Sequence, residues 1–251
     1  MDDVRLTVLG CCGAWPTVGA AGSGYLVEHD GFRLLVDVGY AVVPRLQEYV
    51  AVGELNAVLI SHGHPDHCVD LNPLLRGRML RDDPPAPLPV FAPAGELTAV
   101  LALDRPGMLD AGYGLTDIED GDQFEVGPFA VHARQLPHSR TNLGLRITAG
   151  GRSLVYTGDS GASPVTPELA RDADLLLAEA SFADELAGDC ARDLSTAEQR
   201  GQLATDAGVR HLVLTHLLPG TDPAASAAAA RRHFTGELTI ASSGLAIDLD
   251  S

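Results

Sequence analysis

The segment Ser61-His62-Gly63-His64-Pro65-Asp66-His67-Cys68 places three imidazoles and one carboxylate within six residues. It directly follows residues 57–60, an apolar run that predicts a short buried strand. Packing alone does not explain such a group, because crowded polar side chains lose hydration unless a cation gathers them. The segment therefore predicts a metal site at the end of a buried strand.

One loop of this kind can supply ligands to two metals. In an extended or tightly turned loop, His62 and His64 can point to one side, while Asp66 and His67 point to another. Each metal then needs further ligands from elsewhere in the chain. Three candidates stand at the ends of predicted strands, namely His138, Asp159 and His216.

The rest of the chain predicts sheets covered by helices. Strands are expected at residues 4–9, 25–29, 32–37, 57–60, 129–135, 143–149, 153–157, 174–178, 211–214, 238–241 and 245–249. Helices are expected at residues 42–49, 96–103 and 195–207, and a last one is capped by Asp222. We expect a hairpin turn at Asp30-Gly31, a capping box between Ser195 and Glu198, a proline-rich extended connection at residues 82–93 and a loop at residues 107–121. Buried strands that alternate with amphipathic helices are typical of the α/β class.

In this order, the candidate ligands resemble the pattern of the metallo-β-lactamase superfamily. Its loop His-x-His-x-Asp-His is matched by His62, His64, Asp66 and His67, and its later signatures are matched at the three strand ends. The resemblance covers nearly the whole chain. It implies a four-layer αββα sandwich, with two mixed sheets flanked by helices and the site at one edge of both sheets. We therefore expect residues 1–251 to form a single hydrolase domain.

The resemblance also implies a ligand set for two divalent metal ions per chain. The implied ligands are His62, His64 and His138 for one metal and Asp66, His67 and His216 for the other, with Asp159 bridging both. Zinc suits five imidazoles and two carboxylates, and manganese and iron are the alternatives. Two divalent cations outweigh two carboxylates, so the centre would attract an anionic substrate.

Within the superfamily, residues 6–13, 23–27, 34–39 and 178–182 resemble the branch that contains tRNase Z and cyclic-nucleotide phosphodiesterases. Residues 67–71 and 144–147 are most similar to the short bacterial phosphodiesterases of that group. The resemblance implies a phosphodiesterase that acts on a small cyclic nucleotide or related cyclic phosphate, with a metal-bridging hydroxide as nucleophile. The alternatives are a hydrolase of carboxylic esters, lactones or thioesters, and a metal-binding sensor without catalysis.

Two departures from the branch favour a small substrate. Asp193 stands where the branch usually has a histidine, so leaving-group handling or the substrate differs. No Gly- and Lys-rich insertion is present to grip tRNA. All 17 basic residues are arginine, and the formal net charge is −17, which disfavours long nucleic acid.

Several further side chains are candidates for roles at the centre. The carboxylates assigned to catalysis are Asp66, Asp159 and Glu179. For Glu179 two interpretations remain open: it contacts a metal ligand, or it is an ordinary charge at the start of a helix. Ser139 and Arg140 are the candidate substrate contacts. For Asp37 two interpretations stand side by side: an anchor of a ligand-bearing loop, or an ordinary turn carboxylate.

Composition sets the remaining expectations. The four cysteines are too few for a disulfide scaffold, and no apolar run approaches the about 18 residues that a membrane span needs. The first residues lack a signal-peptide core. We therefore expect a cytoplasmic protein with reduced thiols and no membrane partner. Because dimers are common in the branch, a homodimer is expected.

Overall fold

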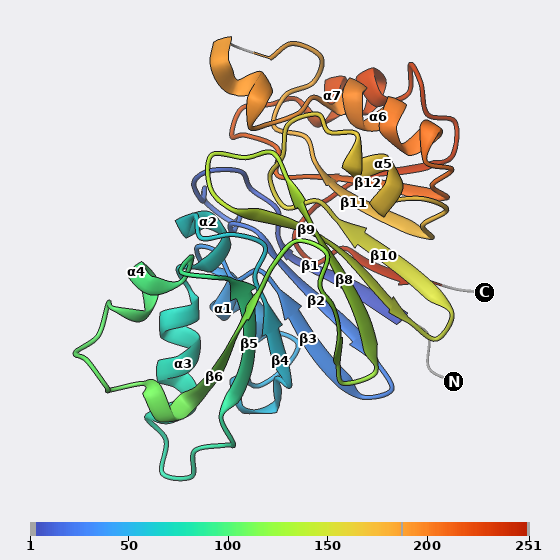
Figure 1. Cartoon of the computed structure of the whole chain (residues 1–251). Coiled ribbons are helices and arrows are strands. Elements are labelled where there is room, and N and C mark those ends of the chain that lie inside the picture. The colour runs from blue at the N-terminus through green and yellow to red at the C-terminus, as the bar shows by residue number, and fades with distance from the viewer. Residues whose placement is uncertain (1–3, 187, 250–251) are drawn as a thin grey trace.

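The computed structural model describes residues 4–186 and 188–249. In these ranges the chain forms two seven-stranded sheets, which lie against each other as two layers (Figure 1). The first sheet has the strand order β14-β1-β2-β3-β4-β5-β6. Its strands are β1 (Val4–Gly10), β2 (Gly24–His29), β3 (Phe32–Val36), β4 (Ala57–Leu59), β5 (Leu88–Pro93), β6 (Tyr113–Ile118) and β14 (Ala246–Leu249).

The second sheet has the order β13-β12-β11-β10-β9-β8-β7. Its strands are β7 (Gln123–Val126), β8 (Phe129–Leu136), β9 (Asn142–Ala149), β10 (Arg152–Tyr156), β11 (Leu175–Glu179), β12 (His211–Thr215) and β13 (Glu237–Ile240). Both sheets are mixed: β3 to β6 and β10 to β13 run parallel, whereas the remaining pairs are antiparallel. The predicted pair of mixed sheets is confirmed.

Helices lie outside the two sheets and complete the four layers (Figure 1). The helices on the side of the first sheet are α1 (Val42–Leu46), α2 (Pro65–Cys68), α3 (Leu71–Met79) and α4 (Thr98–Leu101). Those on the side of the second sheet are α5 (Val165–Leu169), α6 (Ala197–Asp206) and α7 (Pro223–Ala230). Three short 3₁₀ helices are η1 (Val52–Glu54), η2 (Asp110–Gly112) and η3 (Gly188–Arg192).

Strand residues alternate between an inner core and two outer cores. In β11, Leu175 and Leu177 face the core between the sheets, whereas Leu176 and Ala178 face the core under α5 to α7. A strand buried on both faces reads as an uninterrupted apolar run, because neither set of side chains meets water. This explains why β4, which precedes His62, is wholly apolar, and why β10 and β12 carry apolar runs before Asp159 and His216.

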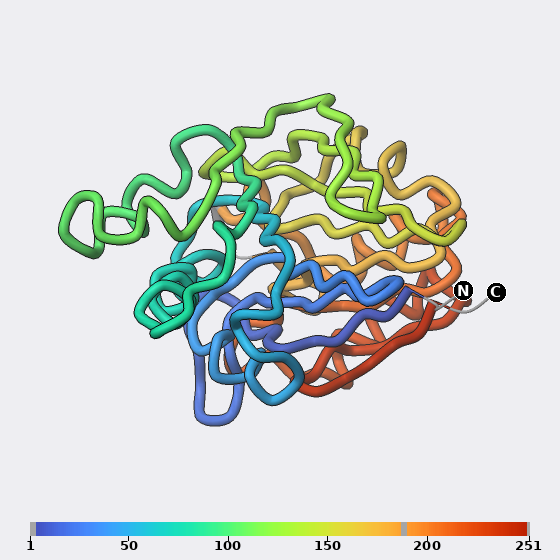
Figure 2. Tube along the Cα trace, turned by 90° about the horizontal axis from the view of Figure 1, so that it is seen from below, coloured from blue at the N-terminus to red at the C-terminus, as the bar shows by residue number. Residues whose placement is uncertain are grey.

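The last strand of the chain lies beside the first. β14 pairs antiparallel with β1, with Val4 opposite Leu249 and Thr7 opposite Ala246. Figure 2 shows the red end of the trace alongside the dark blue beginning. The first sheet therefore contains both the earliest and the latest strand of the described chain.

Asp30-Gly31 forms the predicted hairpin turn between β2 and β3. Both residues have positive φ, 48° for Asp30 and 78° for Gly31. Two successive residues with positive φ are the requirement of a type I′ turn, whose twist matches the flanking strands.

The structure contains elements that were not expected, among them α2, α3, α5 and β7, and it also differs from the expectation at β5, at β6 and at the capping box. β5 lies within the proline-rich connection, and β6 lies within the expected loop at residues 107–121. β6 is an edge strand with mostly exposed side chains, so it lacks the apolar alternation that reveals a strand. The capping box is displaced by one residue: Thr196 and Gln199 form it, while the Ser195 hydroxyl donates to the Ser160 carbonyl.

In residues 4–186 and 188–249 no helix has both the length and the apolar character that crossing a membrane requires.

All four cysteines are free, and two of them allow a chemical test of burial. Burial raises the pKa of the Cys11 thiol to about 11 and that of Cys68 to about 12. Because the thiolate is the reactive form, we expect iodoacetamide at pH 8 to leave both residues unmodified in the folded protein. Both should be alkylated in denaturant, as measured by peptide mass spectrometry. Native labelling at the rate of a free thiol would contradict the described packing.

Candidate metal centre

Four strand ends converge at one edge of the molecule. Asp37 follows β3 and His62 follows β4, which are parallel neighbours in the first sheet. Asp159 follows β10 and His216 follows β12 in the second sheet. Since the carboxyl ends of parallel strands meet at the same sheet edge, the topology brings these residues together.

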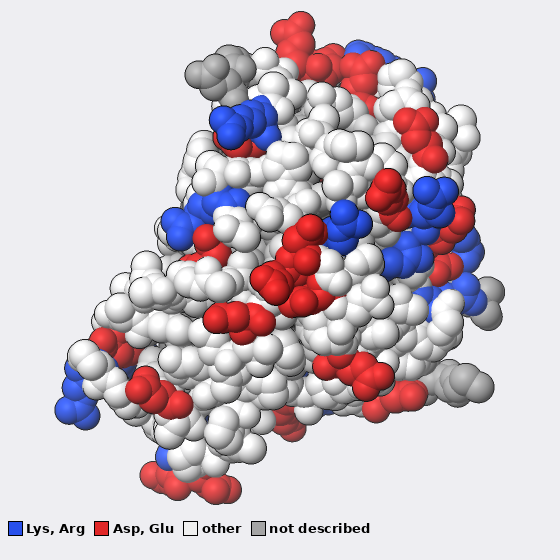
Figure 3. Space-filling model, in the orientation of Figure 1, with Lys and Arg blue, Asp and Glu red and all other residues white. Residues whose placement is uncertain are grey.

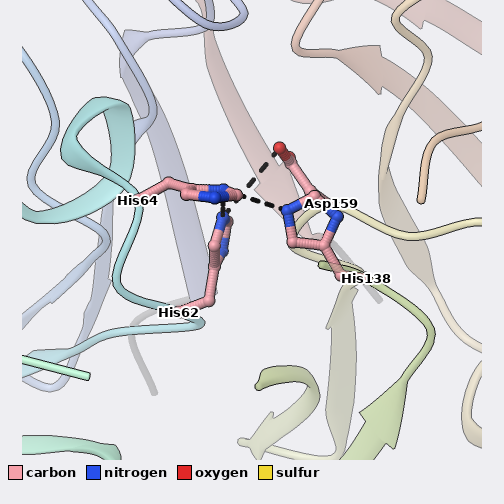
Figure 4. A group of neighbouring side chains, drawn as sticks. All are labelled: His62, His64, His138 and Asp159. Carbon is pink, nitrogen blue, oxygen red and sulfur yellow. Dashed lines mark hydrogen bonds and ion pairs between the residues drawn. The ribbon is translucent and has the colours of Figure 1, made fainter. Parts of the chain in front are cut away.

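The first group of candidate ligands comprises His62, His64, His138 and Asp159. One nitrogen or oxygen from each lies within 4.8 Å of the others. His62 Nε2 and His138 Nε2 each lie 3.0 Å from His64 Nδ1. Figure 4 shows the four side chains pointing toward one another, His62 and His64 from one loop and His138 and Asp159 from two other segments.

The second group comprises Asp66, His67, Asp159 and His216, all buried, with ligand atoms again within 4.8 Å of one another. His216 Nε2 is 3.2 Å from Asp66 Oδ2 and 3.3 Å from Asp159 Oδ2. His67 Nε2 is 3.3 Å from Asp159 Oδ1. Asp159 is the one residue common to both groups, as the resemblance implies.

Asp37 anchors the second group. It is fully buried, and its Oδ2 accepts a 2.7 Å hydrogen bond from His67 Nδ1. Oδ2 also accepts from the hydroxyls of Ser61 and Tyr156, while Oδ1 accepts from the Ser61 amide. A proton held on Nδ1 leaves the lone pair of His67 Nε2 for a metal. Of the two interpretations of Asp37, the structure shows the anchor.

Other imidazoles are oriented in the same way. The Asp193 carbonyl can only accept, so the 2.8 Å contact requires His138 Nδ1 to carry the proton. His138 Nε2 then keeps its lone pair toward the group. Ser181 Oγ lies 3.2 Å from His216 Nδ1. Position 193, where the branch usually has a histidine, thus contacts the centre through the backbone carbonyl of Asp193.

Backbone geometry fixes the approach of the loops. Asp37 and His216 both adopt positive φ, 56° and 58°, a conformation that costs about 1–3 kcal/mol in a non-glycine residue. A Cβ on Gly13 would lie 2.8 Å from His216 Nδ1, so only glycine fits there. The next residue, Ala14, donates its amide to Asp66 Oδ2 at 2.8 Å. The loop after β1 therefore closes over the second group.

The charge balance of the site calls for cations. Burial, reinforced by the neighbouring His67, lowers the pKa of His62 well below its ordinary value. Burial alone would also lower the pKa of His67. The carboxylates of Asp159 and Asp37 outweigh this effect and raise the pKa of His67 above its ordinary value. Burial alone would raise the pKa of Asp66, but the hydrogen bond from His216 outweighs burial and lowers this pKa to about 2. The carboxylates thus remain ionised and attract positive charge to this buried place.

Two buried atoms support occupation by metal. His67 Nε2 and Asp159 Oδ1 have no hydrogen-bond partner within the part of the chain that the structure describes. Unpaired buried polar atoms are rare because they lose hydration without compensation. Converging imidazole nitrogens and a shared carboxylate are a donor set that suits zinc and neighbouring transition metals. The described residues fit two cations, and the groups could bind metal ions.

The remaining predicted residues lie around the centre. Glu179 belongs to neither group: its carboxylate accepts from the amides of Ser181 and Ser195 and from Arg200. Ser139 is exposed beside His138. Arg140 Nε donates to Glu96 Oε2 at 2.6 Å, and its side chain is 42% exposed.

Two neighbours of the candidate ligands were not predicted from the sequence. Glu96 accepts from the amide of Gly63, between two ligands, and so links the metal loop to Arg140. No sequence pattern around Glu96 indicates this. Arg200 is buried on the same face of α6 as Ala197 and Ala204. The sequence does contain a signal for Arg200: a charged residue on the apolar stripe of a helix needs a buried partner of opposite charge or a hydrogen-bond acceptor.

The comparisons with known proteins agree with the observed fold. A family profile described as a beta-lactamase superfamily domain matches residues 33–217. The chain is 31% identical to the probable metallo-hydrolase YhfI of Bacillus subtilis, over 96% of this chain and 98% of that protein. The crystal structure of YhfI superposes with a TM-score of 0.89 at 30% identity, covering 98% of this chain and 100% of the other.

Two further relatives carry names from RNA processing. Ribonuclease Z of Methanosarcina acetivorans is 27% identical, over 85% of this chain and 87% of that protein. The short form of human tRNase Z (ELAC1) has a TM-score of 0.79 at 23% identity, covering 98% of this chain and 100% of that structure. At that identity, the second likeness shows a shared fold.

Proposed function

The chain belongs to the β-lactamase superfamily and is a metallo-hydrolase of that family, and from this premise we propose that it hydrolyses a small phosphodiester, such as a cyclic nucleotide or a related cyclic phosphate. The observation that carries the proposal is the pair of ligand groups that share Asp159, with the guanidinium of Arg140 linked through Glu96 to the loop that carries His62 and His64. Such a site combines a place for two cations with a cationic side chain, and a phosphodiester is an anion.

Each part of the centre has a chemical task in this proposal. Two divalent cations, most simply zinc, would supply a water of lowered pKa and a Lewis acid for a phosphoryl oxygen. His62, His64 and His138 would hold one of them, and Asp66, His67 and His216 the other, with Asp159 shared. Asp66 stays ionised, so its carboxylate acts only as an acceptor, oriented by the Ala14 amide.

Arg140 is the proposed phosphate contact. Glu96 engages its Nε, and within the described residues its two terminal nitrogens donate to no other group. Arg140 follows His138 by two residues, and Glu96 also holds the Gly63 amide. The guanidinium is thus tied to two ligand-bearing segments at once. A pre-oriented guanidinium can donate two hydrogen bonds to the oxygens of a phosphate.

Two observations favour phosphodiester chemistry on a small molecule. The Methanosarcina relative is named a ribonuclease, and RNA is joined by phosphodiester bonds. The present chain, however, has a net charge of −17 and no lysine. On the face drawn in Figure 3, basic side chains are interspersed with acidic ones and form no broad basic surface among the coloured residues. A long polyanion would meet repulsion that a small phosphate avoids.

A substrate panel tests the proposal. The zinc-loaded protein is assayed against bis(p-nitrophenyl) phosphate and cyclic AMP, and against p-nitrophenyl acetate, a lactone and a thioester at equal metal content. We expect turnover of the phosphodiesters to exceed that of the carboxylic substrates. Preference for a carboxylic ester, lactone or thioester would overturn the phosphodiesterase assignment. Absence of turnover on the whole panel with two metals bound would instead favour a sensor.

Arg140→Gln provides a test of the phosphate contact. We expect KM for the phosphodiester to rise about tenfold or more, because a hydrogen bond to a charged group contributes about 1.5–3 kcal/mol. Turnover of any neutral ester should change little. The matched control is Arg76→Gln, because Arg76 is 41% exposed and pairs with Asp104 away from the ligand groups. Equal effects of the two substitutions would exclude Arg140 from substrate binding.

A further inference from the structure

Arg200 is a buried cation inside α6, with only 2% of its surface exposed. Its Nη2 donates to the Ser160 carbonyl at 2.8 Å, to Ser160 Oγ at 2.9 Å and to Glu179 Oε2 at 3.0 Å. Its Nε donates to the Glu179 carbonyl at 2.8 Å. One guanidinium thus binds the segment that follows β10 and the last residue of β11, the parallel neighbour of β10.

Both of these segments reach the metal centre. Ser160 directly follows Asp159, the carboxylate common to both ligand groups. Glu179 Oε1 accepts from the Ser181 amide at 2.8 Å, and Ser181 Oγ lies 3.2 Å from His216 Nδ1. Two routes therefore lead from Arg200 to ligands, one through Ser160 and one through Glu179 and Ser181. Both ligands belong to the second group, and Asp159 also belongs to the first.

The carboxylate of Glu179 is fully committed to this arrangement. It is completely buried, and besides Ser181 it receives the Ser195 amide at 3.1 Å and the Arg200 guanidinium. Ser195 in turn donates its hydroxyl to the same Ser160 carbonyl that Arg200 binds. The start of α6 and the two strand ends are thus joined in one polar network with no exposed member.

We infer that Arg200 is a positioning residue for the metal centre, and that it sets the affinity of the second ligand group by fixing Asp159 and His216. If Arg200 only neutralised the charge of the Glu179 carboxylate, one cationic nitrogen near that carboxylate would be enough. Arg200 instead uses two nitrogens to join two different strand ends, which an ammonium group cannot reproduce. The inference concerns metal affinity, so it does not depend on which ester the protein hydrolyses.

Arg200→Gln and Arg200→Lys test the inference through zinc binding alone. Affinities are measured by competition with a chromophoric chelator, without any substrate. We expect Arg200→Gln to weaken at least one of two zinc equivalents about 10- to 100-fold, the range found when partners of metal ligands are removed. Lysine keeps a cation beside Glu179 but loses the second attachment. Arg200→Lys should therefore regain thermal stability relative to Arg200→Gln without regaining zinc affinity.

The control is a second buried arginine on the far side of the molecule. Arg78 in α3 is 4% exposed and donates to the carbonyls of Val52, Leu55 and Ala86. Arg78→Gln should lower the melting temperature while both zinc equivalents keep the wild-type affinity. Unchanged zinc affinity in Arg200→Gln would overturn the inference, as would full recovery of affinity in Arg200→Lys. A general loss of affinity in Arg78→Gln would do the same, because destabilisation alone would then explain the effect.

Discussion

Replacing Asp159 by alanine is expected to remove metal retention and nearly all hydrolytic activity. Asp159 is the carboxylate that both ligand groups share, and it lies 3.3 Å from both His67 Nε2 and His216 Nε2. Without it, the imidazoles face one another with no shared anion to offset two cations. The loss should exceed the about 10- to 100-fold that removal of an outer partner of a ligand typically causes.

Metal content after purification and kcat/KM on bis(p-nitrophenyl) phosphate measure this effect. Asp174→Ala serves as the matched control, because Asp174 is also largely buried and precedes β11, at the opposite end of the second sheet. It pairs with Arg152 and Arg210 and touches no candidate ligand. Asp174→Ala should keep both metals. Two equivalents of metal in Asp159→Ala would refute the shared-carboxylate arrangement.

Asp37→Asn should produce the second-largest effect, through a change in the tautomer of His67. In the present structure Asp37 accepts from His67 Nδ1 and from the hydroxyls of Ser61 and Tyr156. An amide NH₂ in that place donates to Nδ1 and so favours the tautomer with the proton on Nε2. That nitrogen could then no longer hold a metal. We expect zinc affinity to fall about 10- to 100-fold.

The same substitution should destabilise the metal-free fold by about 1–3 kcal/mol, because a buried donor is left facing other donors. Denaturant unfolding in chelator measures this part of the effect. Tyr156→Phe is the matched control, since it removes one donor to Asp37 and leaves the His67 hydrogen bond in place. Zinc affinity should change little in Tyr156→Phe. If both variants weaken zinc equally, orientation of His67 is not the cause.

The ligand set could be predicted from the sequence because its residue types are rare in such density and each segment that carries them follows a predicted strand. His62, His64, Asp66 and His67 stand in one loop, so local pattern alone indicated a metal. The order of His138, Asp159 and His216 supplied the rest, through resemblance. The structure brings all seven residues into the two expected groups. Residues 30–31 likewise carried enough local information to define the hairpin between β2 and β3.

Features that depend on distant contacts could not be predicted in the same way. β6 is held by β5 at the sheet edge, and its exposed side chains leave no periodic pattern. Glu179 has the residue type of a catalytic acid, yet its partners come from α6 and from the segment after β11. The displaced capping box has a similar cause, since Ser195 is recruited by the Ser160 carbonyl and Thr196 becomes the cap. In each case a tertiary partner decides between local alternatives of nearly equal energy.

The pairing of β14 with β1 has a consequence for synthesis on the ribosome. A nascent chain exposes β1 and its neighbour β2 long before β14, the antiparallel neighbour on the other side of β1, has been translated. During this interval one border of β1 has unpaired backbone groups, which can template association with other chains. Chaperone protection of the amino-terminal hairpins would matter most in that interval, and late truncations would harm solubility more than their distance from the metal centre suggests.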